Sequence, residues 1–145
     1  MTSITENRPA AMADIAPFLD RIGAPPPAAL RHLEETVHMR DKTGLTVTFN
    51  FGKKLEPDQA LSVAAYCASA FNALGFEAAP AARPQIEHAH RNTNVTLRFP
   101  ADGIPGDMRA KPKKYDYELD EFEKVDSVGK LWTALRTVRQ AAKLA

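Results

Sequence analysis

The chain has 145 residues, the usual size of one domain, and its 19 Lys and Arg residues nearly balance its 18 Asp and Glu residues. Leu, Ile, Val and Phe number 31, just above the level of roughly 20% below which chains tend to be disordered. No stretch reaches the ~20 apolar residues that a membrane helix needs, so we expect no membrane partner. A single cysteine, Cys67, excludes a disulfide framework, and no apolar leader is present; we therefore expect a cytoplasmic protein.

The N-terminal part combines a polar tail with two expected helices. Residues 1–12 show no hydrophobic period, which predicts a flexible tail. Four apolar residues then share one helical stripe: Ile15, Phe18, Leu19 and Ile22. After a run of three prolines, a second stripe predicts a helix from about 28 to 42: Leu30, Leu33 and Val37. Together these segments predict an N-terminal helical pair over 13–43.

Two later segments alternate between apolar and polar residues, as half-buried strands do. The apolar positions of the first are Leu45, Val47, Phe49 and Phe51. Those of the second are Val95, Leu97 and Phe99. Residues 85–90 are expected to be a weaker strand, joined to the second by a turn at 91–93. A further alternation predicts a strand at 115–119.

Two longer helical stripes complete the pattern. One runs over 58–74 and includes Cys67, which we expect to be a buried, inert thiol. The other begins near 126 or 127 and includes Trp132, which we expect in the core. The sequence therefore predicts an α+β fold: a two-layer sandwich whose mostly antiparallel sheet of three to four strands is covered by two main helices. We place this core domain at 44–145, after the helical pair.

The histidines suggest one possible metal site. His88 and His90 form a His-x-His pair, and residues two apart on a strand share a face, so both rings could meet one ion. A zinc site needs three or four ligands, however, and no other His, Cys or carboxylate stands at a diagnostic spacing. The alternative is a pair of solvated histidines beside a turn. We expect no cofactor, because no phosphate-cradling loop or nucleophile motif is present.

Charge is segregated along the C-terminal third. An acidic segment over 116–126 lies between a basic loop and a basic helix. The basic residues are Arg109, Lys111, Lys113 and Lys114 in the loop, and Lys130, Arg136, Arg139 and Lys143 in the helix. Three interpretations are open: a docking surface for a protein, a surface that binds nucleic-acid phosphates, or neutralisation of the acidic segment by its neighbours.

The small number of large apolar residues and the absence of a recognisable set of catalytic residues favour a small non-enzymatic interaction or assembly protein. We expect it to be a subunit of a larger complex or a homo-oligomer that docks through its charged surface and N-terminal helical pair. The first alternative is a nucleic-acid-binding protein that uses 109–114 and the basic C-terminal helix. The second is a metal-dependent enzyme built on the two histidines.

Overall fold

A computed structural model describes residues 17–80, 82–105 and 121–145, apart from the side chains of 121–128. The expected tail at 1–12 and the expected strand at 115–119 lie outside these residues. A short helix at 17–22 comes first. The later elements are η1 (Ala28–His32), β1 (Leu33–Asp41), β2 (Gly44–Phe51), α2 (Pro57–Asn72), β3 (Gln85–His88), β4 (Thr93–Pro100), η2 (Ala101–Gly103) and α3 (Glu121–Leu144).

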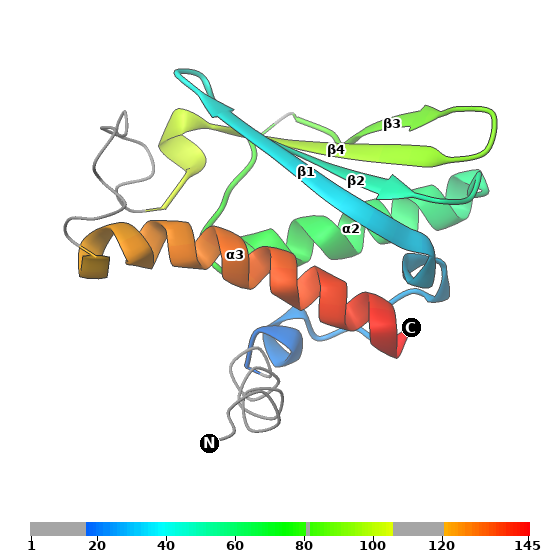
Figure 1. The fold of residues 1–145 in the computed structure, drawn as a ribbon, viewed down its shortest axis with the longest axis horizontal. Helices are drawn as coiled ribbons and strands as arrows, with labels where there is room; N and C mark the ends of the chain where they lie inside the picture. The colour runs from blue at the N-terminus through cyan, green and yellow to red at the C-terminus, as the bar shows by residue number, and fades with distance from the viewer. Residues whose placement is uncertain (1–16, 81, 106–120) are drawn as a thin grey trace.

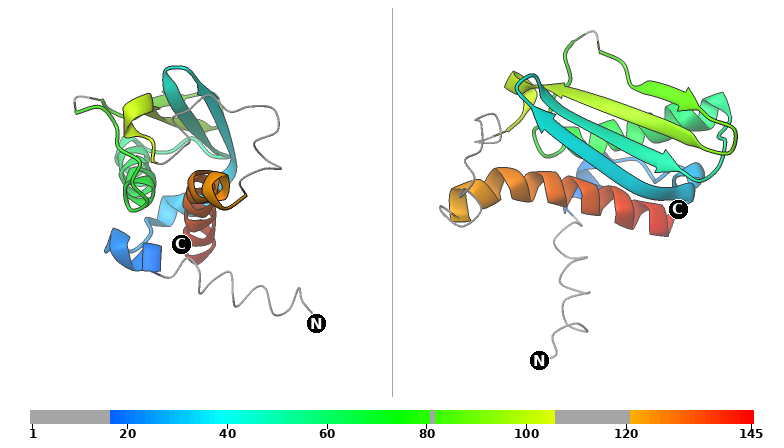
Figure 2. Two further views of the ribbon diagram at one scale, coloured as in Figure 1. Left: turned by 90° about the vertical axis from the view of Figure 1, so that its left-hand side faces the viewer. Right: turned by 45° about the horizontal axis from the view of Figure 1, so that its top comes forward.

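The elements form two layers (Figures 1 and 2). One layer is a four-stranded sheet in the order β1-β2-β4-β3, and every neighbouring pair is antiparallel. The other layer holds the two long helices on one face of the sheet, where α2 contacts β4 and α3 contacts β1. This arrangement confirms the α+β fold class and the mostly antiparallel sheet.

The core lies between the sheet and the helices, and the predicted faces of β2 and β4 are correct. Seven alternating apolar side chains of these strands are buried: Leu45, Val47, Phe49, Phe51, Val95, Leu97 and Phe99. From α2, the ring of Phe71 stacks on Phe99 with centroids 5.3 Å apart. The intervening residues Thr46, Thr48 and Asn50 are half-buried on the opposite face, which no helix within the described ranges covers (Figure 2, right).

Helix α2 fits its prediction closely. Pro57 opens the helix, where its missing N–H removes no hydrogen bond, and Glu56 N–H donates to Gln59 Oε1 over 2.9 Å. Cys67 is fully buried on the apolar stripe, and this burial raises the pKa of its thiol. The expected burial of Cys67 is therefore confirmed. In the parts of the chain that the structure describes, no helix is long and apolar enough to span a bilayer.

The expected second N-terminal helix is wrong. Residues 28–42 form a single 3₁₀ turn, η1, followed by the nine-residue strand β1. β1 pairs with β2 along its whole length, so it belongs to the sheet and not to a helical pair. Its sequence alternates after Glu35, with Thr36, His38 and Arg40 on one face and Val37 and Met39 on the other. Pairing with β2 therefore decides its conformation, although three apolar residues also fit a helical spacing.

Two turns join the antiparallel pairs. Between β1 and β2, the Asp41 carboxylate accepts hydrogen bonds from Thr43 Oγ1 at 2.6 Å and Thr43 N–H at 2.8 Å, which lower the pKa of Asp41. Gly44 follows at φ +146°, and a side chain there would overlap the Phe99 carbonyl of β4. Between β3 and β4, Ala89 N–H donates to Asn92 O over 2.9 Å. β3 therefore ends at His88, two residues before its expected end.

Candidate functional site

The basic residues of α3 that the structure describes form a stripe. Residues 132, 136, 139 and 143 share one side of the helix, because they stand four, three and four residues apart. Arg136, Arg139 and Lys143 are exposed along this side, whereas Lys130 is half-buried and already interacts within the molecule. The basic loop residues Arg109, Lys111, Lys113 and Lys114 lie outside the described residues. The structure thus brings together three of the eight expected basic residues.

Trp132 heads this stripe, and the expectation that it belongs to the core is wrong. Its side chain is 51% exposed, and its ring meets His38 of β1 edge-to-face, with centroids 5.4 Å apart. On α3, the buried residues whose side chains are described are Leu131, Ala134, Leu135, Thr137, Val138 and Ala141. Adjacent helical residues point about 100° apart, so Trp132 falls beside this buried side, where the sheet ends.

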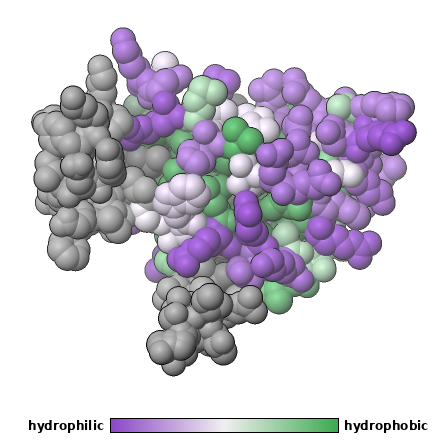
Figure 3. All heavy atoms as spheres, in the orientation of Figure 1, coloured by the Kyte–Doolittle hydropathy of each residue, from purple (hydrophilic) through white to green (hydrophobic). Residues whose placement is uncertain are grey.

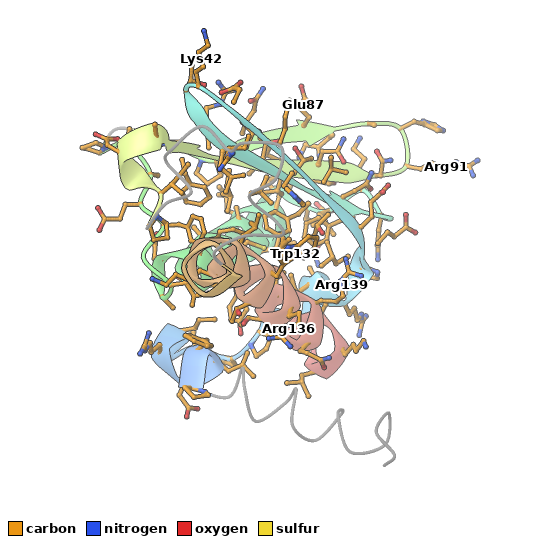
Figure 4. All side chains as sticks on the ribbon, turned by 60° about the vertical axis from the view of Figure 1, so that its left-hand side comes forward. Lys42, Glu87, Arg91, Trp132, Arg136 and Arg139 are labelled. Atoms are coloured by element: carbon orange, nitrogen blue, oxygen red, sulfur yellow. The ribbon has the colours of Figure 1, made fainter. Side chains whose placement is uncertain are left out.

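β1 lies directly beside the stripe and is one of the two edge strands of the sheet. Arg139 Nη2 lies 3.4 Å from Thr36 Oγ1, so α3 meets β1 at Thr36 as well as at His38. On the other face of β1, Val37 is 52% exposed and Met39 is 65% exposed. Figure 4 shows Trp132, Arg136 and Arg139 along α3 near β1. In Figure 3, the face that carries these two elements exposes hydrophobic surface between charged side chains.

We call six exposed residues of these two elements the β1–α3 surface: Val37 and Met39 on the open face of β1, and Trp132, Arg136, Arg139 and Lys143 on its helix side. At one end of it lies a hollow of about 300 Å³, lined by residues of η1, β1 and α3: Arg31, Leu33, Glu34, Arg139, Ala142 and Lys143. Sequence reasoning missed the contribution of β1, because it treated this segment as a helix. The period of two from Thr36 to Arg40 is the signal that could have revealed it.

The two candidate metal ligands do not share a face of one strand, because β3 ends at His88 and His90 lies in the turn. Both residues are exposed, and His88 Nδ1 lies 3.1 Å from Thr93 Oγ1. Across the described ranges, no group of three or more His, Cys, Asp or Glu residues is placed to hold a metal ion. Among the residues that the structure describes, the His-x-His pair therefore has no third ligand of the kind that a zinc site requires.

A larger hollow of about 450 Å³ lies beside β4, between α2 and the segment at 77–84. Ala and Pro residues, with Leu97 and Phe99 of β4, provide much of its lining, and the charged residues are Glu77, Arg83 and Arg98. All three are exposed. This hollow holds no pair of nucleophile and base, so it supports no catalytic assignment.

In comparisons with known proteins, no family model, curated protein or solved structure matches the chain.

Proposed function

We propose that the chain is a small non-enzymatic interaction protein, a subunit of a larger assembly, whose partner docks on the β1–α3 surface. One observation carries the proposal. Among the described residues, five large hydrophobic side chains are exposed, and three of them flank the edge strand β1: Val37 and Met39 lie on its open face, and Trp132 contacts His38 on its helix side. Exposed apolar side chains that cluster beside charged ones mark interaction sites more often than scattered ones do.

The chemistry of the surface supports a protein partner. Trp and Arg are the residues that contribute most often to binding energy in protein interfaces, and both types stand here side by side. The three cations of the stripe favour a partner that carries acidic groups, because complementary charge increases the rate of association and fixes the orientation. A reducing, cytoplasmic setting suits the single buried thiol.

Nucleic-acid binding through the basic helix remains the alternative prediction. Arg136, Arg139 and Lys143 would contact phosphates, and binding would then weaken steeply with salt. Undiminished binding of labelled DNA or RNA by a variant that lacks these three cations would exclude this use of the helix.

Site-specific photo-crosslinking in the natural host tests the proposal. A benzoylphenylalanine replaces Val37 or Trp132, and a matched protein carries it at Leu61, which is similarly exposed but belongs to α2. We expect the same crosslinked protein from positions 37 and 132, identified by mass spectrometry, and none from position 61. The far-UV circular dichroism of all three proteins should match that of the unmodified chain.

Two results would contradict the proposal. Crosslinks of equal yield at position 61 would show unspecific contact. Crosslinks absent from both 37 and 132, while the protein is folded and expressed at its natural level, would show that nothing docks at the β1–α3 surface.

A further inference from the structure

The outer edge of β1 has a defined set of backbone groups that face away from the sheet. Ala89 N–H donates to Asn92 O, so Ala89 and Asn92 are the hydrogen-bonded pair that closes the β3–β4 hairpin. Hydrogen-bonded and non-hydrogen-bonded residue pairs alternate along antiparallel strands. The strand registers therefore tell which backbone groups of β4, then of β2 and finally of β1 point toward each neighbouring strand. The backbone groups of Val37 and Met39 then face β2, and those of Thr36 and His38 face outward.

No strand among the described residues pairs with these outward groups. Within the described ranges, no backbone hydrogen bond involves Thr36 or His38 on this side of β1. A long edge strand with unpaired N–H and C=O groups is a template for the addition of another extended segment. Such a segment would receive four main-chain bonds from these two residues alone.

The two faces beside this edge differ in chemistry. An added antiparallel strand would place every second side chain on the open face, next to Val37 and Met39, which are apolar. The intervening side chains would point to the helix side, where Thr36 and His38 stand above Arg139 and Trp132. Apolar side chains therefore suit the first set of positions and acidic ones suit the second.

We infer that the β1–α3 surface binds an extended acidic peptide segment, in which apolar and acidic residues alternate, by antiparallel strand addition to β1. This inference rests on the proposed function and names the class of partner. A second copy of the chain fits less well, because pairing of β1 with its own copy brings the two cationic α3 stripes to one interface. A nucleic acid satisfies the cations but leaves Val37, Met39 and the strand edge without partners.

The test is the fluorescence anisotropy of a labelled heptapeptide, Val-Asp-Val-Asp-Val-Asp-Val, titrated with the full chain. Hydrogen-bonded residues of antiparallel strands share a face, so the amides that bond to Thr36 and His38 are those of the aspartates. N-methylation of the Asp amides should weaken binding about tenfold or more, because each methyl group removes a donor. N-methylation of the Val amides, which point to solvent, should leave binding unchanged.

Matched variants place the binding on the surface. Arg136→Glu should weaken binding of the heptapeptide about fivefold or more, because it reverses one charge of the stripe. Arg91→Glu makes the same change in the β3–β4 turn, beside the opposite edge strand of the sheet (Figure 4), and should have little effect. A heptapeptide with Lys in place of Asp should not bind.

The outcomes separate this inference from the proposed function. Equal affinity of the two N-methylated peptides, or no binding of the parent peptide, would overturn strand addition, while crosslinks at positions 37 and 132 would still support an interaction surface. Concentration-dependent dimerisation that Arg136→Glu strengthens would assign the edge to a second copy and overturn the peptide. If an oligonucleotide displaces the parent and both N-methylated peptides equally well, the surface would be assigned to nucleic acid.

Discussion

Thr93 shows how one buried hydroxyl can connect three segments. It is fully buried at the start of β4, and its Oγ1 accepts a hydrogen bond from Leu55 N–H over 2.9 Å, in the connection before α2. His88 of β3 lies 3.1 Å away on the same oxygen. Leu55 is itself buried, so its N–H has no access to water when this acceptor is removed.

Replacing Thr93 with Val should therefore lower the free energy of unfolding by about 1–3 kcal/mol, the cost of leaving a buried donor without a partner. Urea denaturation followed by circular dichroism measures this change. His88→Ala is the control, because His88 is exposed and its loss leaves the bond between Leu55 and Thr93 in place. It should change the free energy of unfolding by no more than about 0.5 kcal/mol. Equal losses in both variants would show that Leu55 does not depend on the hydroxyl.

Cys67 and Trp132 show which side-chain environments the sequence could predict. Cys67 stands in the middle of a wide apolar stripe, so a small error in the orientation of α2 would still leave it buried. Trp132 stands at the boundary of the stripe on α3, and its environment depends on where the sheet ends above it. The position of that boundary depends on how α3 packs against the sheet, and the spacing of apolar residues along one helix does not predict it.

The strand faces provide a prediction about β2 and β4. Leu97→Asp or Phe49→Asp would bury a carboxylate among apolar side chains, at a cost of several kcal/mol against a total stability of about 5–15 kcal/mol. We expect both variants to lose the cooperative thermal transition. Thr48→Asp lies on the opposite, half-buried face and removes a bond of 3.1 Å to the Thr96 hydroxyl, so it should cost about 1 kcal/mol and leave the transition in place. Similar melting curves for Phe49→Asp and Thr48→Asp would mean that these faces are wrongly assigned.

The strands of the core were predictable because alternation over seven residues in β2 is hard to mistake for a helix. β1 was not, because a helical spacing of Leu30, Leu33 and Val37 competes there with a shorter alternation. In the structure the first of these residues is buried in η1, and Val37 is exposed on the sheet. A tight turn brings β1 beside β2, and the pairing of the two strands outweighs the weak helical preference of the β1 sequence. The same misjudged segment carries the edge of the candidate surface, so the site could not be predicted either.

The sheet has two edges, and both carry a glutamate in the same row across the strands. Glu35 of β1 pairs with Asn50, Asn50 with Asn94, and Asn94 with Glu87 of β3. Both glutamates are exposed. Charged side chains on edge strands oppose the pairing of one molecule with another, because each approaching copy brings the same charge. This protection matters more at β1, which has nine residues and exposed apolar side chains, than at β3, which has four.

Glu35→Val should therefore promote self-association of the whole molecule. It would make three successive open-face positions of β1 apolar, at 35, 37 and 39, beside the outward backbone groups of Thr36 and His38. We expect the weight-average mass from light scattering to rise with protein concentration. Glu87→Val removes the matching charge at the opposite edge, where the strand is too short to template a stable pair, and should leave the mass nearly constant. If Glu87→Val associates as strongly as Glu35→Val, general loss of charge is responsible, and the edge of β1 has no special affinity for extended segments.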